Sequence, residues 1–256
     1  MQSLFPGNQK TINDTVELAG FTIDGSKTEV QLHPFDKGIV FQKGRTEYPL
    51  NPAPIVVKKN RVYIGPIGMI EHLLAVLAGL GIDNILVEVG GGELPIFDGS
   101  VKEYYEALSD TGIYDLKTAR NFFKFQTGEL DISESYIEAE ESDCAELKIE
   151  YDPGHPMVRK SRVKFSRIED LAGARTFGFV RADDPRLKDY RFGVGITDDQ
   201  IYPALRYPDE PIRHKLLDLI GDLYTIGRPF TGKIRAKNPN HQLNTTFVKQ
   251  QIIEWP

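Results

Sequence analysis

The segment RHKLLDLIGD, residues 213–222, places a histidine and two aspartates at intervals of four residues. At about 100° per residue, His214, Asp218 and Asp222 lie on one flank of a helix, and its apolar side chains lie on the opposite flank. Residues four apart on a helix have Cβ atoms about 5–6 Å apart, so an imidazole nitrogen and a carboxylate oxygen can bind one cation. A solvated helix face with an ordinary His–Asp contact shows the same spacing. The pattern therefore leaves a metal pair and a polar surface as alternatives.

A second segment, IEHLLAVLAGLG at residues 70–81, has only two strongly polar side chains, Glu71 and His72, among apolar residues. Such a helix is expected to be buried nearly all round. A buried carboxylate is costly unless it is paired or takes part in chemistry. A Glu–His pair satisfied within the core and a functional pair are therefore both compatible with this segment.

Taken together, His72, His214 and Asp218 would form a three-ligand zinc site whose fourth position is open to water, as in catalytic zinc sites. Glu71 and His241 would remain as an acid/base pair. His241 stands in KNPNHQLN, a polar loop predicted between the last strand and the last helix, where functional residues often lie. The same two nitrogens and one oxygen suit Fe²⁺ as well as Zn²⁺.

The elements that must position these residues follow an order that occurs twice. In the first half, strand-like runs precede the helix with His72, and a strand and a helix follow it, at residues 15–23, 28–35, 38–43, 54–65, 84–89 and 101–112. In the second half the corresponding segments are 121–132, 136–142, 145–152, 162–166, the helix 211–227 with His214, 229–237 and the helix 243–255. Gly79 and Gly221 each stand seven residues after the histidine of their helix, although two helices can share a His and a Gly by chance. We predict an α+β fold with two similar domains, residues 1–118 and 119–256, each a β-sheet packed with a pair of helices.

Composition narrows the class of protein. The 256 residues are 40% hydrophobic and 27% charged, as in a globular protein. A net charge of −6 argues against nucleic-acid binding, although a few local Lys and Arg side chains can hold an anionic small substrate. The single cysteine, Cys144, excludes an internal disulfide framework and fits a reducing, cytoplasmic location. No apolar run of about 18 residues and no export signal is found, so no transmembrane segment is predicted.

Five segments in a fixed order closely resemble the zinc-dependent UDP-3-O-acyl-N-acetylglucosamine deacetylases of lipid A biosynthesis. They are IEHLLAVLAGLGIDN, LPIFDGS, ARTFGF at 174–179, RHKLLDLIGDL at 213–223 and NHQLN at 240–244. The resemblance implies two α+β domains with the active site between them. It also implies a UDP-amino-sugar substrate whose N-acetyl group is hydrolysed in the committed step of lipid A synthesis. Because two such domains would already enclose the site, we expect a monomer.

The resemblance assigns a role to each matching position. His72, His214 and Asp218 match the zinc ligands, Glu71 matches the general base, and His241 matches the general acid. The remaining matches are Asp222 as the carboxylate that orients and charges the catalytic histidine, Thr176 as the hydroxyl that helps to hold the oxyanion, and Lys215, Phe179 and Lys237 as substrate-binding residues.

The departures from the family concern the substrate more than the chemistry. The N-terminal segment AGFTIDGSK has no histidine where the family has one, and the interval 180–212 is short and polar where the family has a passage for the acyl chain. Asn238 replaces a phosphate-facing lysine, with Lys237 one place earlier. Three functions stay open: a lipid A enzyme that holds its acyl chain differently, a deacetylase of a UDP-N-acetyl amino sugar with a short or absent acyl chain, and a non-catalytic regulatory homologue.

Overall fold

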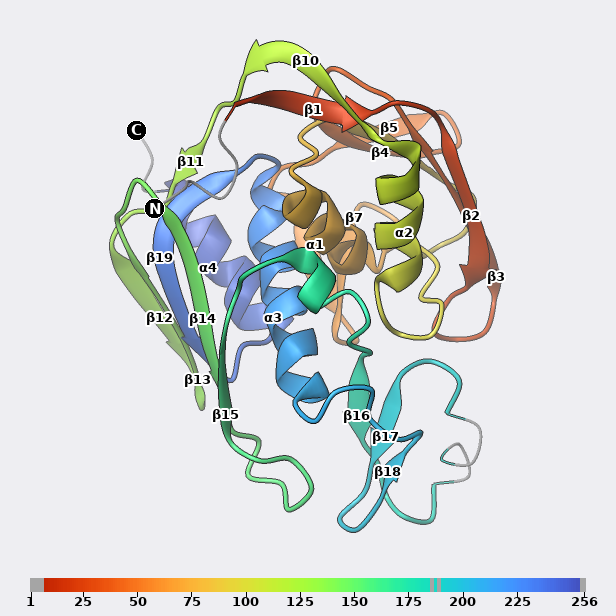
Figure 1. Cartoon of the computed structure of the whole chain (residues 1–256), viewed down its shortest axis with the longest axis vertical. Helices are drawn as coiled ribbons and strands as arrows, with labels where there is room; N and C mark the ends of the chain where they lie inside the picture. Colours follow the sequence, from red (N-terminus) through yellow and green to blue (C-terminus); the bar gives the residue numbers. More distant parts are fainter. Residues whose placement is uncertain (1–6, 185–186, 188–189, 254–256) are drawn as a thin grey trace.

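A five-stranded and a six-stranded β-sheet with helices between them form the framework of the protein (Figure 1). The computed structural model describes residues 7–184, 187 and 190–253. Several sheets and four α-helices are present among these residues, in agreement with the predicted α+β class. None of the described helices is long and apolar enough to cross a membrane.

The elements follow one another along the chain in two series. The first series is β1 (Asn8–Ile12), β2 (Val16–Phe21), β3 (Lys27–His33), β4 (Ile39–Lys43), β5 (Thr46–Pro49), β6 (Ile55–Lys58), β7 (Arg61–Ile64), β8 (Ile67–Gly68), α1 (Ile70–Leu80), β9 (Ile85–Val89), α2 (Lys102–Thr111) and β10 (Ile113–Ala119). The second series is β11 (Phe123–Lys124), β12 (Gly128–Ile132), β13 (Ser135–Glu140), β14 (Ala145–Tyr151), β15 (Ser161–Lys164), η1 (Ile168–Asp170), β16 (Phe177–Phe179), β17 (Val194–Ile196), β18 (Ile201–Tyr202), α3 (Glu210–Leu223), η3 (Tyr224–Ile226), β19 (Phe230–Lys237) and α4 (His241–Ile253).

The two large sheets share a strand order. The first runs β2-β3-β9-β4-β5, and the second runs β12-β13-β19-β14-β15, with β11 paired to β19. In each sheet the strand that follows the helix, β9 or β19, lies at the centre, antiparallel to one neighbour and parallel to the other. A small antiparallel ribbon of β1 and β10 accompanies them, and residue 118, the predicted domain boundary, lies within β10.

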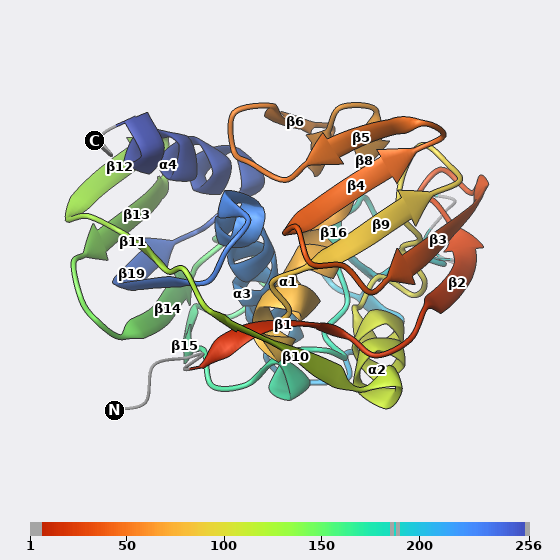
Figure 2. The same cartoon turned by 90° about the horizontal axis from the view of Figure 1, so that it is seen from above.

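Alternation of apolar and polar residues decides which face of each sheet is buried. In β19, Phe230, Ile234 and Ala236 are buried, whereas Arg235 and Lys237 on the opposite face are exposed. Helices α3 and α4 pack against the second sheet. The apolar face of the second sheet thus meets these helices, and Figure 2 shows α1 and α3 between the two large sheets.

Helices α1 and α3 pack against each other at the centre of the molecule. The prediction that α1 is buried nearly all round is confirmed, because its residues from Ile70 to Ala78 are all buried. The two helices come close together at Gly221 of α3, where a Cβ atom would come 2.1 Å from the backbone oxygen of Glu71. The glycine thus lets α3 approach the turn of α1 that carries Glu71 and His72.

We expect Gly221→Ala to destabilise the protein and to weaken metal binding. Alanine favours a helix over glycine by about 1 kcal/mol, but its methyl group would push against backbone, and overpacking of this kind costs about 1–3 kcal/mol or more. Denaturant unfolding and metal titration measure the two effects. Gly92→Ala is a matched control, since nothing lies within 4 Å of a Cβ there. Equal unfolding midpoints for both variants would contradict this account of the helix contact.

Several segments differ from the sequence-based expectations, and among them residues 121–132, predicted as one strand, form the two strands β11 and β12. Residues 54–65, predicted as one strand, form a hairpin of β6 and β7, because Lys59 and Asn60 adopt positive φ angles of 49° and 57° in a two-residue turn. The interval 180–212, where no strand is predicted, contributes β17 and β18 to a three-stranded sheet with β16. Helix α4 begins at His241 rather than at residue 243, so His241 does not lie in a loop. The predicted end of this helix, residues 254–255, lies outside the described residues.

Candidate active site

Three helices bring their polar residues to one cavity of about 410 Å³. Helix α1 contributes Glu71 and His72, α3 contributes His214 and Asp218, and α4 contributes His241 as its first residue. The first and the last of these residues in the sequence, Glu71 and His241, are more than 160 positions apart. The packing of α1 on α3, and of α4 on α3, is what brings them together.

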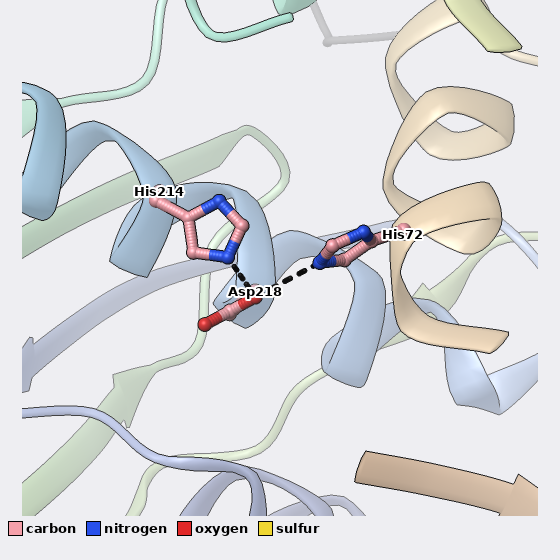
Figure 3. Close-up of side chains that lie close together, drawn as sticks. All are labelled: His72, His214 and Asp218. Atoms are coloured by element: carbon pink, nitrogen blue, oxygen red, sulfur yellow. Dashed lines mark ion pairs between the residues drawn. The ribbon is translucent and has the colours of Figure 1, made fainter. Parts of the chain in front are cut away.

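His72, His214 and Asp218 form a compact group that could hold a metal ion. All three are buried, and one possible ligand atom from each lies within 4.8 Å of the others. Figure 3 shows the two imidazoles, from α1 and α3, on either side of the Asp218 carboxylate. Nε2 of His214 and Nε2 of His72 lie 3.3 Å and 3.9 Å from Oδ1 of Asp218. That oxygen is buried without a hydrogen-bond partner among the described residues, as expected of an atom that binds a cation.

The protonation states of these three side chains also suit the binding of a metal ion. Nδ1 of His214 lies 3.1 Å from the backbone oxygen of Ala174, which can only accept, so Nδ1 carries the proton and Nε2 presents its lone pair. Burial lowers the pKa of His72 to about 3 and also lowers the pKa of His214. Burial alone would raise the pKa of Asp218, but His214, His241 and Lys215 hold it well below its usual value. Two neutral imidazoles and a carboxylate are the forms that bind divalent cations.

Glu71 lies beside this group without belonging to it. Its Oε2 accepts a hydrogen bond of 3.1 Å from the backbone N–H of Val62, and its Oε1 lies 3.9 Å from Nε2 of His241. Burial raises the pKa of Glu71 to about 8, although the charge of His241 acts in the opposite direction. A carboxylate that titrates near neutral pH in a cavity is suited to general base chemistry.

His241 is held as a cation by a buried carboxylate. Its Nδ1 lies 3.0 Å and 2.9 Å from the two oxygens of Asp222, which is fully buried. Asn244 donates a further hydrogen bond of 2.8 Å to Oδ2 of Asp222. Burial alone would lower the pKa of His241, but Asp222 and Asp218 outweigh it and raise that pKa to about 10. An imidazolium oriented in this way can donate a proton from Nε2, which faces the cavity residues.

Thr176 and Lys215 also line the cavity. The backbone N–H of Thr176 donates a hydrogen bond of 2.7 Å to the backbone oxygen of Gly99, and its side chain is half-buried. Nζ of Lys215 lies 3.4 Å from Oδ2 of Asp218 and 5.8 Å from the centre of the Phe177 ring. Both residues are thus in the same cavity as the metal-binding group.

The other two predicted substrate contacts lie elsewhere. Phe177 lines the cavity, whereas Phe179 is 46% exposed and stacks on His155 with 4.4 Å between the ring centres. Lys237 lies on the outward face of β19 and lines a different cavity together with Arg235. The structure therefore does not bring Phe179 or Lys237 to the metal-binding group, and their roles stay predictions.

The hairpin turn between β6 and β7 was not predicted from the sequence. Lys59, Asn60 and Arg61 of this hairpin line the cavity. Nη1 of Arg61 lies 2.6 Å from Oε1 of Glu93, which also accepts a hydrogen bond of 2.7 Å from Tyr63. The KKN turn between two short β-branched runs is a hairpin signal, but nothing in it indicates which cavity the turn reaches.

Comparison with known proteins decides the family. The sequence profile of the UDP-3-O-acyl N-acetylglycosamine deacetylase family matches residues 9–253. The chain belongs to this family. It is 32% identical to the UDP-3-O-acyl-N-acetylglucosamine deacetylase of Psychrobacter cryohalolentis over 276 residues, which cover 96% of this chain and 86% of that protein. It is 31% identical to the deacetylase of that name from Nautilia profundicola, with 96% and 92% covered, and 29% identical to that of Neisseria meningitidis serogroup C, with 96% and 90% covered.

Membership of this deacetylase family agrees with the resemblance found in the sequence. The matched residues include both helices that carry the metal-binding group and the helix that begins at His241. The match therefore spans all three helices that contribute to the cavity.

Proposed function

We propose that this deacetylase hydrolyses the N-acetyl group of a UDP-activated glucosamine, with UDP-3-O-acyl-N-acetylglucosamine as the first candidate substrate. The observation that carries the proposal is the meeting of His72, His214 and Asp218 with Glu71 and His241 in one buried cavity. The names of the relatives support the same substrate. Zn²⁺ is the proposed metal, and Fe²⁺ is the alternative for the same ligands.

Each side chain then has a step to perform. When bound, the metal supplies Lewis-acid chemistry that polarises the amide carbonyl and lowers the pKa of water. Glu71 takes a proton from the attacking water, and the Thr176 hydroxyl donates a hydrogen bond to the developing oxyanion. His241, charged through its contact with Asp222, donates a proton to the departing nitrogen. The C–N bond breaks, and the products are acetate and a free amine.

Acetate release from two sugars tests the proposal. The zinc-loaded protein is incubated with UDP-N-acetylglucosamine and with its 3-O-acyl form. Activity on the acylated sugar alone supports the lipid A enzyme, and activity on the unacylated sugar supports a deacetylase for a substrate with a short or absent acyl chain. If neither sugar releases acetate, the protein is a non-catalytic homologue and the proposal fails.

Three further properties remain part of the proposal. We propose that the two halves, residues 1–118 and 119–256, are duplicated α+β units with the active site between them. The common strand order of the two large sheets supports this interpretation. A monomer in the cytoplasm is proposed because one chain supplies all the proposed metal-binding and acid/base residues of the cavity and the single cysteine suits a reducing compartment. The molar mass of the purified protein, measured by light scattering, tests whether it is a monomer.

We expect Lys59→Ala to raise KM for a UDP-sugar by about two- to fivefold, since an exposed charge pair is worth about 1 kcal/mol or less. The physical reason is that Lys59 adds positive charge to a cavity that would receive a diphosphate. Lys58→Ala is the matched control, because Lys58 is the neighbouring residue and its Nζ lies 5.7 Å from the Tyr63 ring centre. If Lys237→Ala raises KM and Lys59→Ala does not, the diphosphate is held near the second sheet and the hairpin assignment is wrong.

A further inference from the structure

A buried ion pair outside the metal-binding group joins the start of α3 to the segment before β16. Nε of Arg175 lies 2.8 Å from Oε1 of Glu210, and the two side chains are 7% and 1% exposed. Nη2 of Arg175 donates a further hydrogen bond of 3.1 Å to Oε2. The backbone N–H groups of Arg175 and Arg206 donate to the same carboxylate, at 2.9 Å and 2.6 Å. Glu210 is therefore one of the most completely hydrogen-bonded carboxylates among the described residues.

One of these hydrogen bonds leads directly to a residue of the metal-binding group. The N–H of Arg175 belongs to the same peptide group as the carbonyl of Ala174, and that carbonyl accepts the hydrogen bond from Nδ1 of His214 at 3.1 Å. A peptide group is planar, so its N–H and its C=O cannot reorient independently. Whatever fixes the N–H toward Glu210 also fixes the C=O toward His214.

Glu210 and His214 are four residues apart on α3, so both ends of this connection lie on one helix. A metal-bound histidine depends on the partner of its other ring nitrogen for its tautomer and ring orientation. Here that partner is a backbone carbonyl, whose own position needs support. The peptide group of residues 174–175 also stands immediately before Thr176, the proposed oxyanion contact.

We propose that Glu210 is a positioning residue for the metal-binding histidine His214, acting through the peptide group between Ala174 and Arg175. The inference rests on the metal site of the proposed function. It predicts an effect on metal affinity, whereas an ion pair that only supports the fold would affect stability alone. Removing one partner of a buried ion pair is itself destabilising, so stability and metal affinity have to be measured separately.

The test compares Glu210→Gln with the parent protein in a zinc titration against a chromophoric chelator. Glutamine has nearly the size of glutamate. Its N–H₂ group, however, would face one pair of the N–H donors that bind the two oxygens of the Glu210 carboxylate. We expect the dissociation constant for Zn²⁺ to rise by about 10- to 100-fold and the visible spectrum of the Co²⁺-loaded protein to change. Arg175→Lys keeps the backbone N–H, so its metal affinity should stay closer to that of the parent even where the lost guanidinium contacts lower stability.

Asp83→Asn is the matched control. It breaks another buried pair, in which Nε of Arg120 lies 3.0 Å from Oδ2 of Asp83, beyond the far end of α1. This variant should lose stability but keep its metal affinity. If Glu210→Gln is folded and binds Zn²⁺ as tightly as the parent, the inference is wrong while the proposed function stands. If the parent itself binds neither Zn²⁺ nor Fe²⁺, both fail.

Discussion

Replacing Glu71 with glutamine is expected to lower kcat for acetate release by about 10²- to 10⁴-fold, the usual contribution of a general base. Glutamine has nearly the same shape and can still accept the hydrogen bond from the backbone N–H of Val62. It cannot take a proton from water. Because Glu71 is not one of the three residues of the metal-binding group, the variant should retain its metal.

Two measurements on this variant, acetate release and metal content, have to be made together. His214→Ala is the control that should lose both, since His214 belongs to the metal-binding group. Turnover within about threefold of the parent would show that Glu71 is not the base. Loss of the metal from Glu71→Gln would show instead that the carboxylate binds it.

The pH dependence of the parent protein gives a further view of Glu71. The base must be deprotonated, so activity rises as the pH rises through its pKa. Burial raises that pKa to about 8. A cation bound beside Glu71 favours the carboxylate, so the acid limb of the profile should lie below pH 8 in the metal-loaded enzyme.

Helical spacing made the metal-binding group predictable in large part. Positions four apart on a helix face the same way whatever the rest of the fold, so His214 and Asp218 could be paired from sequence alone. Glu71 and His72 were conspicuous because the helix around them is apolar, and the structure buries both residues. In these cases the local helical periodicity was enough to indicate the candidate residues.

The substrate side was much less predictable. Alternation along β19 places Lys237 on the polar face of the sheet, but the cavity that this face lines depends on how the strands pair, and the structure places Lys237 at a different cavity. The hairpin with Lys59 and Arg61 reaches the cavity through tertiary packing that no local pattern encodes. The contact between His241 and Asp222 joins two helices, and the sequence indicated it only through the family resemblance.

Asp222→Asn should move the alkaline limb of the pH–rate profile to lower pH. His241 must be protonated to donate to the leaving nitrogen, so activity falls as the pH rises through its pKa. Asp222 is the largest of the charges that raise this pKa to about 10. Removing a neighbouring charge typically shifts a pKa by about 1–3 units, so the alkaline limb should move down by a similar amount.

The change should affect the profile more than the position of the ring. Asparagine retains one oxygen that can accept from Nδ1 of His241, and Asn244 lies close enough to bind the same side chain. Activity at pH 6, where the imidazole is still charged, should therefore fall less than activity at pH 9. His241→Gln is the matched control, because it removes the titrating group and with it the alkaline limb. A uniform loss at every pH in Asp222→Asn would mean that Asp222 orients His241 without setting its charge.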